Sequence, residues 1–160
     1  MIRPRLESDL PACVTALAGV HETDRYPARW PADPQGWLTP DEMLGAWIVA
    51  DGPVVLGHVA LTRPDSVLAD AVGLPEAEAA AVARLFVAVE ARRSGLAAEL
   101  LAHAAKAAIG EGLRPVLEVE SGAAAAIALY ERAGWRFAGS ATADWIAPDG
   151  RPAVMRFYTG

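Results

Sequence analysis

The chain has 160 residues, of which 53% are hydrophobic and 21% charged, so we expect a single domain with a real core over residues 1–160. It carries 14 Lys and Arg against 20 Asp and Glu, and its net charge of −6 argues against a general nucleic-acid or anionic-membrane binder. The lone cysteine, Cys13, cannot form an internal disulfide. No apolar run resembles a signal peptide or a membrane span, which predicts a cytoplasmic location.

The first forty residues predict a strand, a helix and an irregular segment. A short strand is expected at residues 2–5, and Asp9 is expected to cap a helix that fades near Gly19, with apolar residues spaced by three and four. Residues 21–40 contain four prolines, two tryptophans and a tyrosine. This stretch is too proline-rich for regular structure and too aromatic for a flexible linker, so we expect an ordered, irregular segment.

The middle of the chain predicts three strands. The first two, at residues 46–50 and 54–62, are joined by an Asp-Gly turn, and the third lies at residues 83–89. Residues 63–80 are expected to form a connection that ends in a short acidic helical piece. The Leu-Phe-Val run at residues 85–87 suggests a central strand that is apolar on both faces.

The last third predicts alternating helices and strands, followed by a hairpin. The expected elements are a helix at 95–109, a strand at 115–120, a helix at 122–133 and hairpin strands at 135–147 and 152–158. The complete order predicts a mixed α/β (α+β) fold. Its central mixed sheet would have about six to seven strands, with about four flanking helices.

The turn before the helix at 95–109 has the character of an anion site. It reads Arg-Arg-Ser-Gly-Leu-Ala from residue 92, and its small residues let a ligand approach the backbone closely. Free N–H groups and the positive end of the helix dipole would suit a pyrophosphate, and the two arginines add charge. The spacing fits neither a Walker loop nor the dinucleotide-binding turn. A plain capped turn with solvated arginines explains the same residues.

A second stretch, LEVESGAAAAIALYERAGW, begins at residue 117 and supports a functional interpretation of the turn. Together, residues 84–135 resemble the core of the Gcn5-related N-acetyltransferase (GNAT) superfamily. The family pattern has R/Q-x-x-G-x-G/A after a strand, and later N-x-x-A-x-x-L-Y-x-x-x-G-F. The residues that match these two motifs, in the family's order, are Arg92, Gly95 and Ala97, and then Ala126, Leu129, Tyr130, Gly134 and Trp135. Ala123 stands where the family has asparagine.

The resemblance implies a bacterial N-acetyltransferase that uses acetyl-coenzyme A as co-substrate and needs no metal. The acetyl group would pass to a primary amine, of a small molecule or of a protein N-terminus or lysine, by direct attack in a ternary complex. Main-chain groups of three residues would bind pantetheine and the thioester carbonyl: Leu85, Phe86 and Val87. Seven residues would hold the pyrophosphate: Arg92, Arg93, Ser94, Gly95, Leu96, Ala97 and Ala98.

The same resemblance assigns two catalytic candidates. Tyr130 would give a proton to the departing thiolate, and Glu118 would take a proton from the amine, directly or through water. Glu118 has an equally weighted alternative as a strand-face carboxylate in a salt bridge with Arg114 or Arg84. Glu120, two residues along the same strand face, is a weaker candidate for the base. Tyr130 could also be a core tyrosine whose hydroxyl meets water.

The acceptor pocket would be walled by residues 21–40 and 135–158. Tyr26, Trp30 and Trp145 are the substrate-binding candidates there, since aromatic faces beside acidic groups suit a cationic amine. Three scattered histidines suggest no metal site, and His58 is expected to be exposed or paired. The family habit makes a homodimer plausible. The alternative function is an acyl-coenzyme A-binding sensor or partner module without turnover, which Ala123 favours and the two catalytic candidates oppose.

Overall fold

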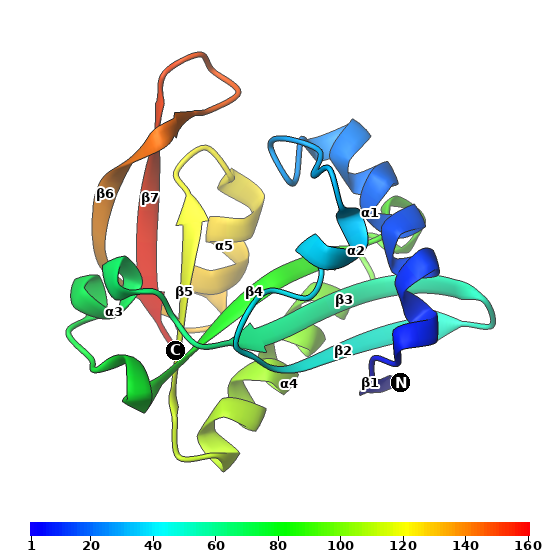
Figure 1. The fold of residues 1–160 in the computed structure, drawn as a ribbon, viewed down its shortest axis with the longest axis horizontal. Coiled ribbons are helices and arrows are strands. Elements are labelled where there is room, and N and C mark those ends of the chain that lie inside the picture. The colour runs from blue at the N-terminus through cyan, green and yellow to red at the C-terminus, as the bar shows by residue number, and fades with distance from the viewer. The chain divides into compact units, whose positions relative to one another are not determined.

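The computed structural model describes residues 1–160 and contains seven strands and five α-helices. In chain order these are β1 (Ile2–Pro4), α1 (Leu10–Asp24), α2 (Pro34–Trp37), β2 (Met43–Asp51), β3 (Val54–Thr62), α3 (Ser66–Val72), β4 (Ala79–Val87), α4 (Leu96–Gly110), β5 (Arg114–Glu120), α5 (Ala124–Arg132), β6 (Arg136–Ile146) and β7 (Pro152–Thr159). Short 3-10 turns lie at Glu7–Asp9, Glu76–Glu78 and Val89–Ala91. The strands form one sheet in the order β1-β2-β3-β4-β5-β7-β6 (Figure 1).

The sheet is mixed, as the sequence predicts. β4 and β5 run parallel, while β1 with β2, β2 with β3, β5 with β7 and β6 with β7 are antiparallel. The parallel pair needs a long crossover, and α4 provides it. The predicted mixed α/β fold with six to seven strands and flanking helices is therefore confirmed.

Several elements differ from the sequence-based expectation. Helix α1 continues through Gly19 to Asp24, because Val20 extends the buried apolar stripe and one glycine costs a helix only about 1 kcal/mol. Residues 63–80, expected as a connection, contain α3, whose N-cap Asp65 accepts a hydrogen bond from the N–H of Leu68 at 2.8 Å. The acidic helical piece is only a three-residue 3-10 turn, and Ala79–Val82 already belong to β4.

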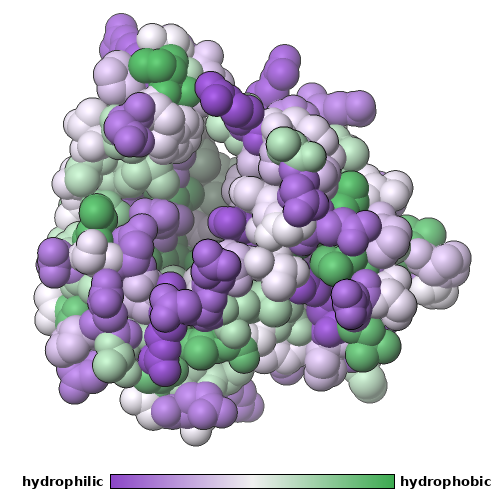
Figure 2. Space-filling view, in the orientation of Figure 1, coloured by the Kyte–Doolittle hydropathy of each residue, from purple (hydrophilic) through white to green (hydrophobic).

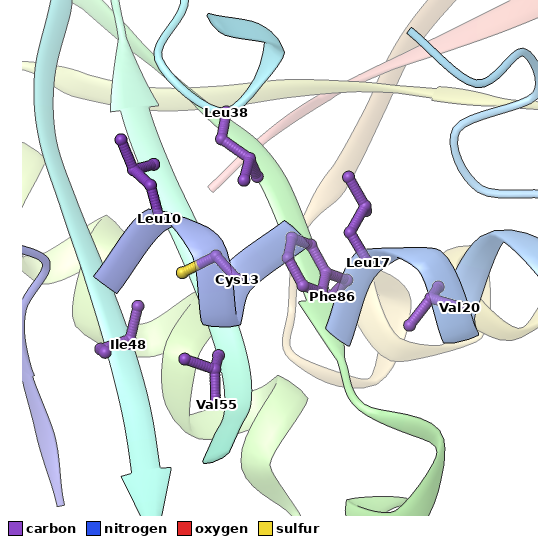
Figure 3. Packing of buried hydrophobic residues seen from close by; sticks show 8 residues of the cluster. All are labelled: Leu10, Cys13, Leu17, Val20, Leu38, Ile48, Val55 and Phe86. Carbon is purple, nitrogen blue, oxygen red and sulfur yellow. The ribbon is translucent and has the colours of Figure 1, made fainter. Parts of the chain in front are cut away.

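The chain divides into two compact units, Met1–Thr62 with Ala83–Ala104, and Arg63–Val82 with Ala105–Gly160. In the first unit, α1 packs against β3, and its buried stripe meets side chains from the strands (Figure 3). The members of this cluster are Leu10, Cys13, Leu17, Val20, Leu38, Ile48, Val55 and Phe86. Burial raises the pKa of the Cys13 thiol to about 11, so this side chain is a neutral core residue, as the sequence predicts.

The second unit is built on β5 and β7. Helix α3 packs against β5, β6 and β7, and the apolar cluster below it consists of Leu68, Ala79, Ala81, Val116 and Phe157. No helix of the chain combines the length and the apolar character that crossing a bilayer demands. On the side of the molecule that Figure 1 presents, hydrophobic residues are scattered among hydrophilic ones (Figure 2).

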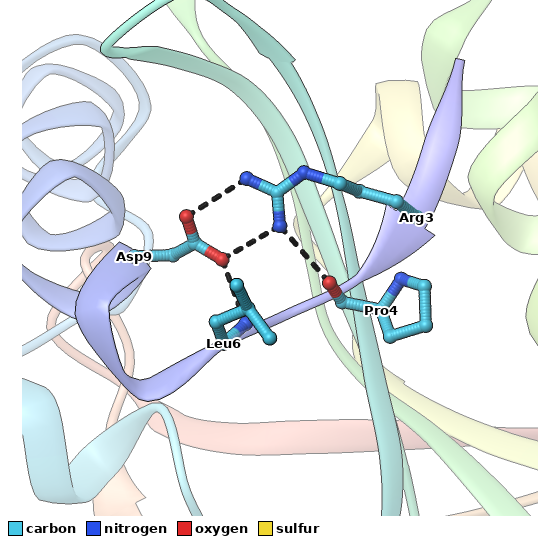
Figure 4. A network of polar contacts seen from close by, with 4 residues as sticks. All are labelled: Arg3, Pro4, Leu6 and Asp9. Atoms are coloured by element: carbon cyan, nitrogen blue, oxygen red, sulfur yellow. Dashed lines mark hydrogen bonds and ion pairs between the residues drawn. The ribbon is translucent and has the colours of Figure 1, made fainter.

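A polar network ties β1 to the start of α1 (Figure 4). The Asp9 carboxylate accepts hydrogen bonds from the two terminal guanidinium nitrogens of Arg3 at 2.8 and 2.9 Å, and from the N–H of Leu6 at 2.7 Å. These bonds lower the pKa of Asp9 to about 2. Asp9 occupies the predicted cap position, but its side chain makes no cap hydrogen bond to α1. The predicted position is right and the predicted contact is wrong.

Candidate active site

The turn predicted to bind pyrophosphate joins β4 to α4 within the first unit. Gly95 has a φ of +81°, and a Cβ placed on it would meet no other atom within 4 Å. The helix ladder starts where the N–H of Glu99 bonds to the carbonyl of Gly95 at 3.1 Å. The N–H groups of residues 96–98 therefore precede the ladder and have no acceptor within the helix. Open backbone and N–H donors that the helix itself does not use are what an anion needs.

The two arginines of this turn differ in their contacts. Arg92 forms an ion pair with Asp24 at the end of α1, with 3.1 Å between Nη1 and Oδ1, and a second, shorter contact joins Nη2 to Oδ2. The side chains are 36% and 44% exposed, and an ion pair as exposed as this contributes only about 0–1 kcal/mol. Arg92 can therefore exchange Asp24 for a phosphate at little cost. Arg93 is exposed and has a left-handed φ of +60°.

The end of β4, where main-chain contacts to pantetheine are predicted, is irregular. Phe86 is buried and Leu85 and Val87 are half-buried. Arg84, just before them, has a φ of +54°, a left-handed conformation inside a strand. Such a residue interrupts the pleat and turns the following peptide groups away from a regular ladder.

A buried histidine contacts the main chain at this irregular end of β4. His58 on β3 is fully buried, and its Nδ1 lies 2.8 Å from the carbonyl oxygen of Arg84 while its Nε2 lies 2.9 Å from Nη1 of Arg5. Arg5 also donates to the carbonyl of Leu38 at 2.6 Å and to the hydroxyl of Thr39 at 2.7 Å. Burial, together with the nearby positive charges of Arg5 and Arg84, lowers the pKa of His58 to about 4. His58 is thus paired, as expected, but at the centre of a network that the sequence did not reveal.

One aromatic candidate of the first unit, Tyr26, contacts the same network through Trp37. The guanidinium of Arg84 lies 4.1 Å from the centre of the Trp37 ring, and its Nε donates to the Trp37 carbonyl at 2.8 Å. The Tyr26 ring touches Trp37 edge-on at 5.8 Å, and burial raises the pKa of Tyr26 to about 12. Trp30 packs against His21, with ring centres 5.4 Å apart. Tyr26 and Trp30 are both partly buried against the core, so each offers only part of its ring to a ligand.

The two carboxylates on β5 differ in exposure. Glu118 is exposed between the buried Leu117 and Val119, the alternation that the sequence predicts. Glu120 is half-buried and accepts a hydrogen bond from the N–H of Gly122 at 2.7 Å. Glu118 is therefore the more solvent-exposed of the two carboxylates.

Tyr130 lies on α5 in an aromatic cluster of the second unit. Its side chain is 9% exposed, and its ring centre lies 6.3 Å from that of Trp135 and 6.2 Å from that of Tyr158. The Tyr158 hydroxyl donates to Glu131 and accepts from Arg156, each at 3.0 Å. Packing thus fixes the Tyr130 ring, and a fixed ring keeps its hydroxyl in one place.

Ala123, the departure from the family motif, is the N-cap of α5 and supplies no side-chain hydrogen bond to the helix. Asparagine is among the best N-cap residues. We therefore expect Ala123→Asn to raise the free energy of unfolding by about 1 kcal/mol in urea denaturation. Ala124→Asn, one residue into the helix, is the control and should give no gain. Equal effects of the two changes would contradict the capping explanation.

Trp145, the remaining acceptor candidate, lies on β6 in the second unit and is 36% exposed. Tyr26 and Trp30 thus lie in the first unit, both packed against its core, whereas Trp145, Glu118 and Tyr130 lie in the second. No group of three or more His, Cys, Asp and Glu side chains is arranged to hold a metal ion.

Comparison with known proteins gives one family and many related structures. The family model described as "Acetyltransferase (GNAT) family" matches residues 10–135. Ribosomal-protein-alanine N-acetyltransferase from Brucella melitensis is 24% identical with a TM-score of 0.74, covering 100% of this chain and 98% of its own. The ribosomal-protein-S18-alanine N-acetyltransferase of Escherichia coli is 21% identical with a TM-score of 0.73, at 99% and 92% coverage. Arabidopsis thaliana NAA60, solved with acetyl-CoA, is 19% identical with a TM-score of 0.75, at 100% and 97% coverage. No curated protein matches the sequence.

Proposed function

This chain belongs to the acetyltransferase (GNAT) family and is an acyltransferase, and we propose that it transfers the acetyl group of acetyl-coenzyme A to a primary amine. The observation that carries the proposal is the turn at Gly95, which combines open backbone, N–H groups of residues 96–98 without an acceptor in the helix, and the exposed side chain of Arg92. This turn fits a pyrophosphate, which is the charged group near the middle of coenzyme A. The solved NAA60 complex with acetyl-CoA supports the same co-substrate.

The turn of residues 92–98 would hold the pyrophosphate, and the main chain of residues 85–87 would align the pantetheine arm. Acetyl-coenzyme A supplies a thioester, whose carbonyl carbon an amine can attack. Backbone N–H groups near that carbonyl would stabilise the negative charge that develops on its oxygen. The protein's part in the reaction is therefore to align the thioester and to move two protons.

The first proton leaves the amine. An alkyl amine has a pKa near about 10.4 and is mostly protonated at neutral pH, so attack requires a base. Glu118, exposed and acceptor-only when ionised, would take this proton directly or through one water. Tyr130 would give its hydroxyl proton to the sulfur as the carbon–sulfur bond breaks, and it would regain a proton from solvent. The products are an amide and free coenzyme A.

Replacing Glu118 by glutamine should lower the rate most at low pH. At high pH more of the amine is already neutral, so loss of the base matters less and the ratio of wild-type to variant rate falls towards one. We expect a ratio of roughly 100 at pH 6.5, shrinking to about 10 or less at pH 9.5, in a thiol-release assay. Glu120→Gln is the matched control and should show a small ratio at every pH. A ratio for Glu118→Gln that does not change with pH would rule out its role as base.

Two classes of amine are candidates for the acceptor. Two structural neighbours carry names that describe acetylation of an alanine in a ribosomal protein, which favours peptides with an N-terminal alanine as one class to test. The partly exposed rings of Tyr26 and Trp30 suit any cationic amine, so free polyamines and amino acids form the other class. A panel with both classes distinguishes a protein acceptor from a small-molecule acceptor.

Calorimetric titration with acetyl-coenzyme A, coenzyme A and NADH tests the proposal first. We expect micromolar binding of acetyl-coenzyme A, about −8 kcal/mol, and no binding of NADH. Thiol release with a member of the amine panel would then establish transfer. Binding without release on any amine would favour the sensor alternative, and absence of binding would contradict the proposed function.

A further inference from the structure

His58 occupies the junction between β3, the irregular end of β4 and the segment at residues 37–39. We propose that His58 is a positioning residue for acetyl transfer: held by Arg5, it fixes the peptide group between Arg84 and Leu85 so that the Leu85 N–H is aimed at the thioester oxygen. The inference rests on the proposed function, because it assumes that the end of β4 meets acetyl-coenzyme A. His58 itself, being fully buried, would act only through this peptide group.

The contacts of the ring decide its proton arrangement. The guanidinium of Arg5 has only donors, so Nε2 of His58, at 2.9 Å, must accept. Nδ1 then carries the proton and donates to the carbonyl oxygen of Arg84 at 2.8 Å. The lowered pKa of about 4 keeps the ring neutral at neutral pH, so this tautomer persists. The stacked Phe86 ring, 5.1 Å away and tilted by 14°, prevents the imidazole from turning.

Because of the geometry of the peptide group, this hydrogen bond fixes the direction of the Leu85 N–H. The carbonyl of Arg84 and the N–H of Leu85 belong to one planar trans unit, so they point in opposite directions. When His58 holds the oxygen on its own side, the N–H must point to the other side. The left-handed φ of +54° at Arg84 is strained for a non-glycine residue, and the bond from His58 offsets part of that strain.

Two further bonds keep the peptide group in place. Nε of Arg84 donates to the carbonyl of Trp37, and Arg5 donates to the carbonyl of Leu38, at 2.8 and 2.6 Å. The side chains of Arg84 and Arg5 are therefore both anchored to the segment at residues 37–39. An N–H that is held before the substrate arrives needs no reorganisation when negative charge forms on the thioester oxygen.

A comparison of two ligands tests this role without knowledge of the acceptor. Acetyl-coenzyme A has the thioester oxygen and coenzyme A lacks it, so only the former can use the Leu85 N–H. We expect His58→Leu to weaken acetyl-coenzyme A binding about 10-fold in calorimetry while changing coenzyme A binding less than about 2-fold. His58→Asn places an amide donor near the position of Nδ1 and should restore acetyl-coenzyme A binding to within about 3-fold of wild type.

His103→Asn is the matched control, since His103 lies on α4 with its ring against Trp47, and it should leave both affinities unchanged. If His58→Leu does not fold, His58→Gln replaces it, because glutamine extends its amide towards the Nε2 position and should show the same selective loss. Equal losses for both ligands, no loss, or no recovery in His58→Asn would overturn the positioning role. A wild-type protein that binds neither ligand would instead overturn the proposed function, and this inference with it.

Discussion

Replacement of Gly95 by glutamate is expected to weaken acetyl-coenzyme A binding at least about 100-fold in calorimetric titration. The side chain would project where nothing now lies within 4 Å of a Cβ, and its carboxylate would face the charge of the pyrophosphate. The φ of +81° adds strain of about 1–2 kcal/mol for any residue other than glycine. That strain would lower stability, so affinity has to be compared with a variant that shares it.

Gly112→Glu is that variant. Gly112 follows α4, has a φ of +76°, and also has nothing within 4 Å of a Cβ placed on it. The two changes therefore introduce the same charge and similar backbone strain at opposite ends of one helix. Gly112→Glu should lose similar stability and keep acetyl-coenzyme A affinity within about 3-fold. Full binding by Gly95→Glu would mean that the pyrophosphate lies elsewhere.

Tyr130→Phe is expected to lower kcat about 100-fold with less than about a 3-fold change in acetyl-coenzyme A affinity. The change removes one hydroxyl and keeps the ring that packs against Trp135 and Tyr158. If the hydroxyl gives its proton to the departing sulfur, its loss affects the transition state and leaves the bound ground state nearly unchanged. Initial rates of thiol release at saturating substrates measure the effect.

Tyr158→Phe is the control from the same cluster. Its hydroxyl bonds to Glu131 and Arg156, so removal should cost about 1 kcal/mol of stability. Since we assign Tyr158 no proton transfer, kcat should stay within about 3-fold of wild type. Similar falls in kcat for both variants would assign the Tyr130 effect to packing, and an unchanged kcat in Tyr130→Phe would end its role as proton donor.

The elements that the sequence predicted well are those whose signals are local. The spacing of Leu10, Cys13 and Leu17 gave α1, and the Gly95 turn lies where its composition placed it. The alternation around Glu118 correctly put that carboxylate on the exposed side of β5. Each of these signals depends on residues within one or two turns of each other, where backbone preference and apolar spacing dominate.

Errors arose where packing overrode a local signal. The sequence predicts that α1 ends near Gly19, but burial of Val20 carries the helix onward. Helix α3 was missed, although Asp65 and Gly73 are good cap residues, because the prolines around it suggested a connection. No local signal in the sequence predicts the ion pair between Asp24 and Arg92, since 68 residues separate the two.

The sequence by itself determined the mixed α/β class, the order of the strands and helices from β4 to α5, and the family motifs that contain Gly95 and Tyr130. Tertiary structure alone decided the surroundings of His58, which joins Arg5 and Arg84 across separations of 53 and 26 residues. The physical reason is that a motif reflects the conformation of a short stretch of backbone. The hydrogen bonds of a buried polar ring depend instead on which distant donors and acceptors the folded sheet brings to it.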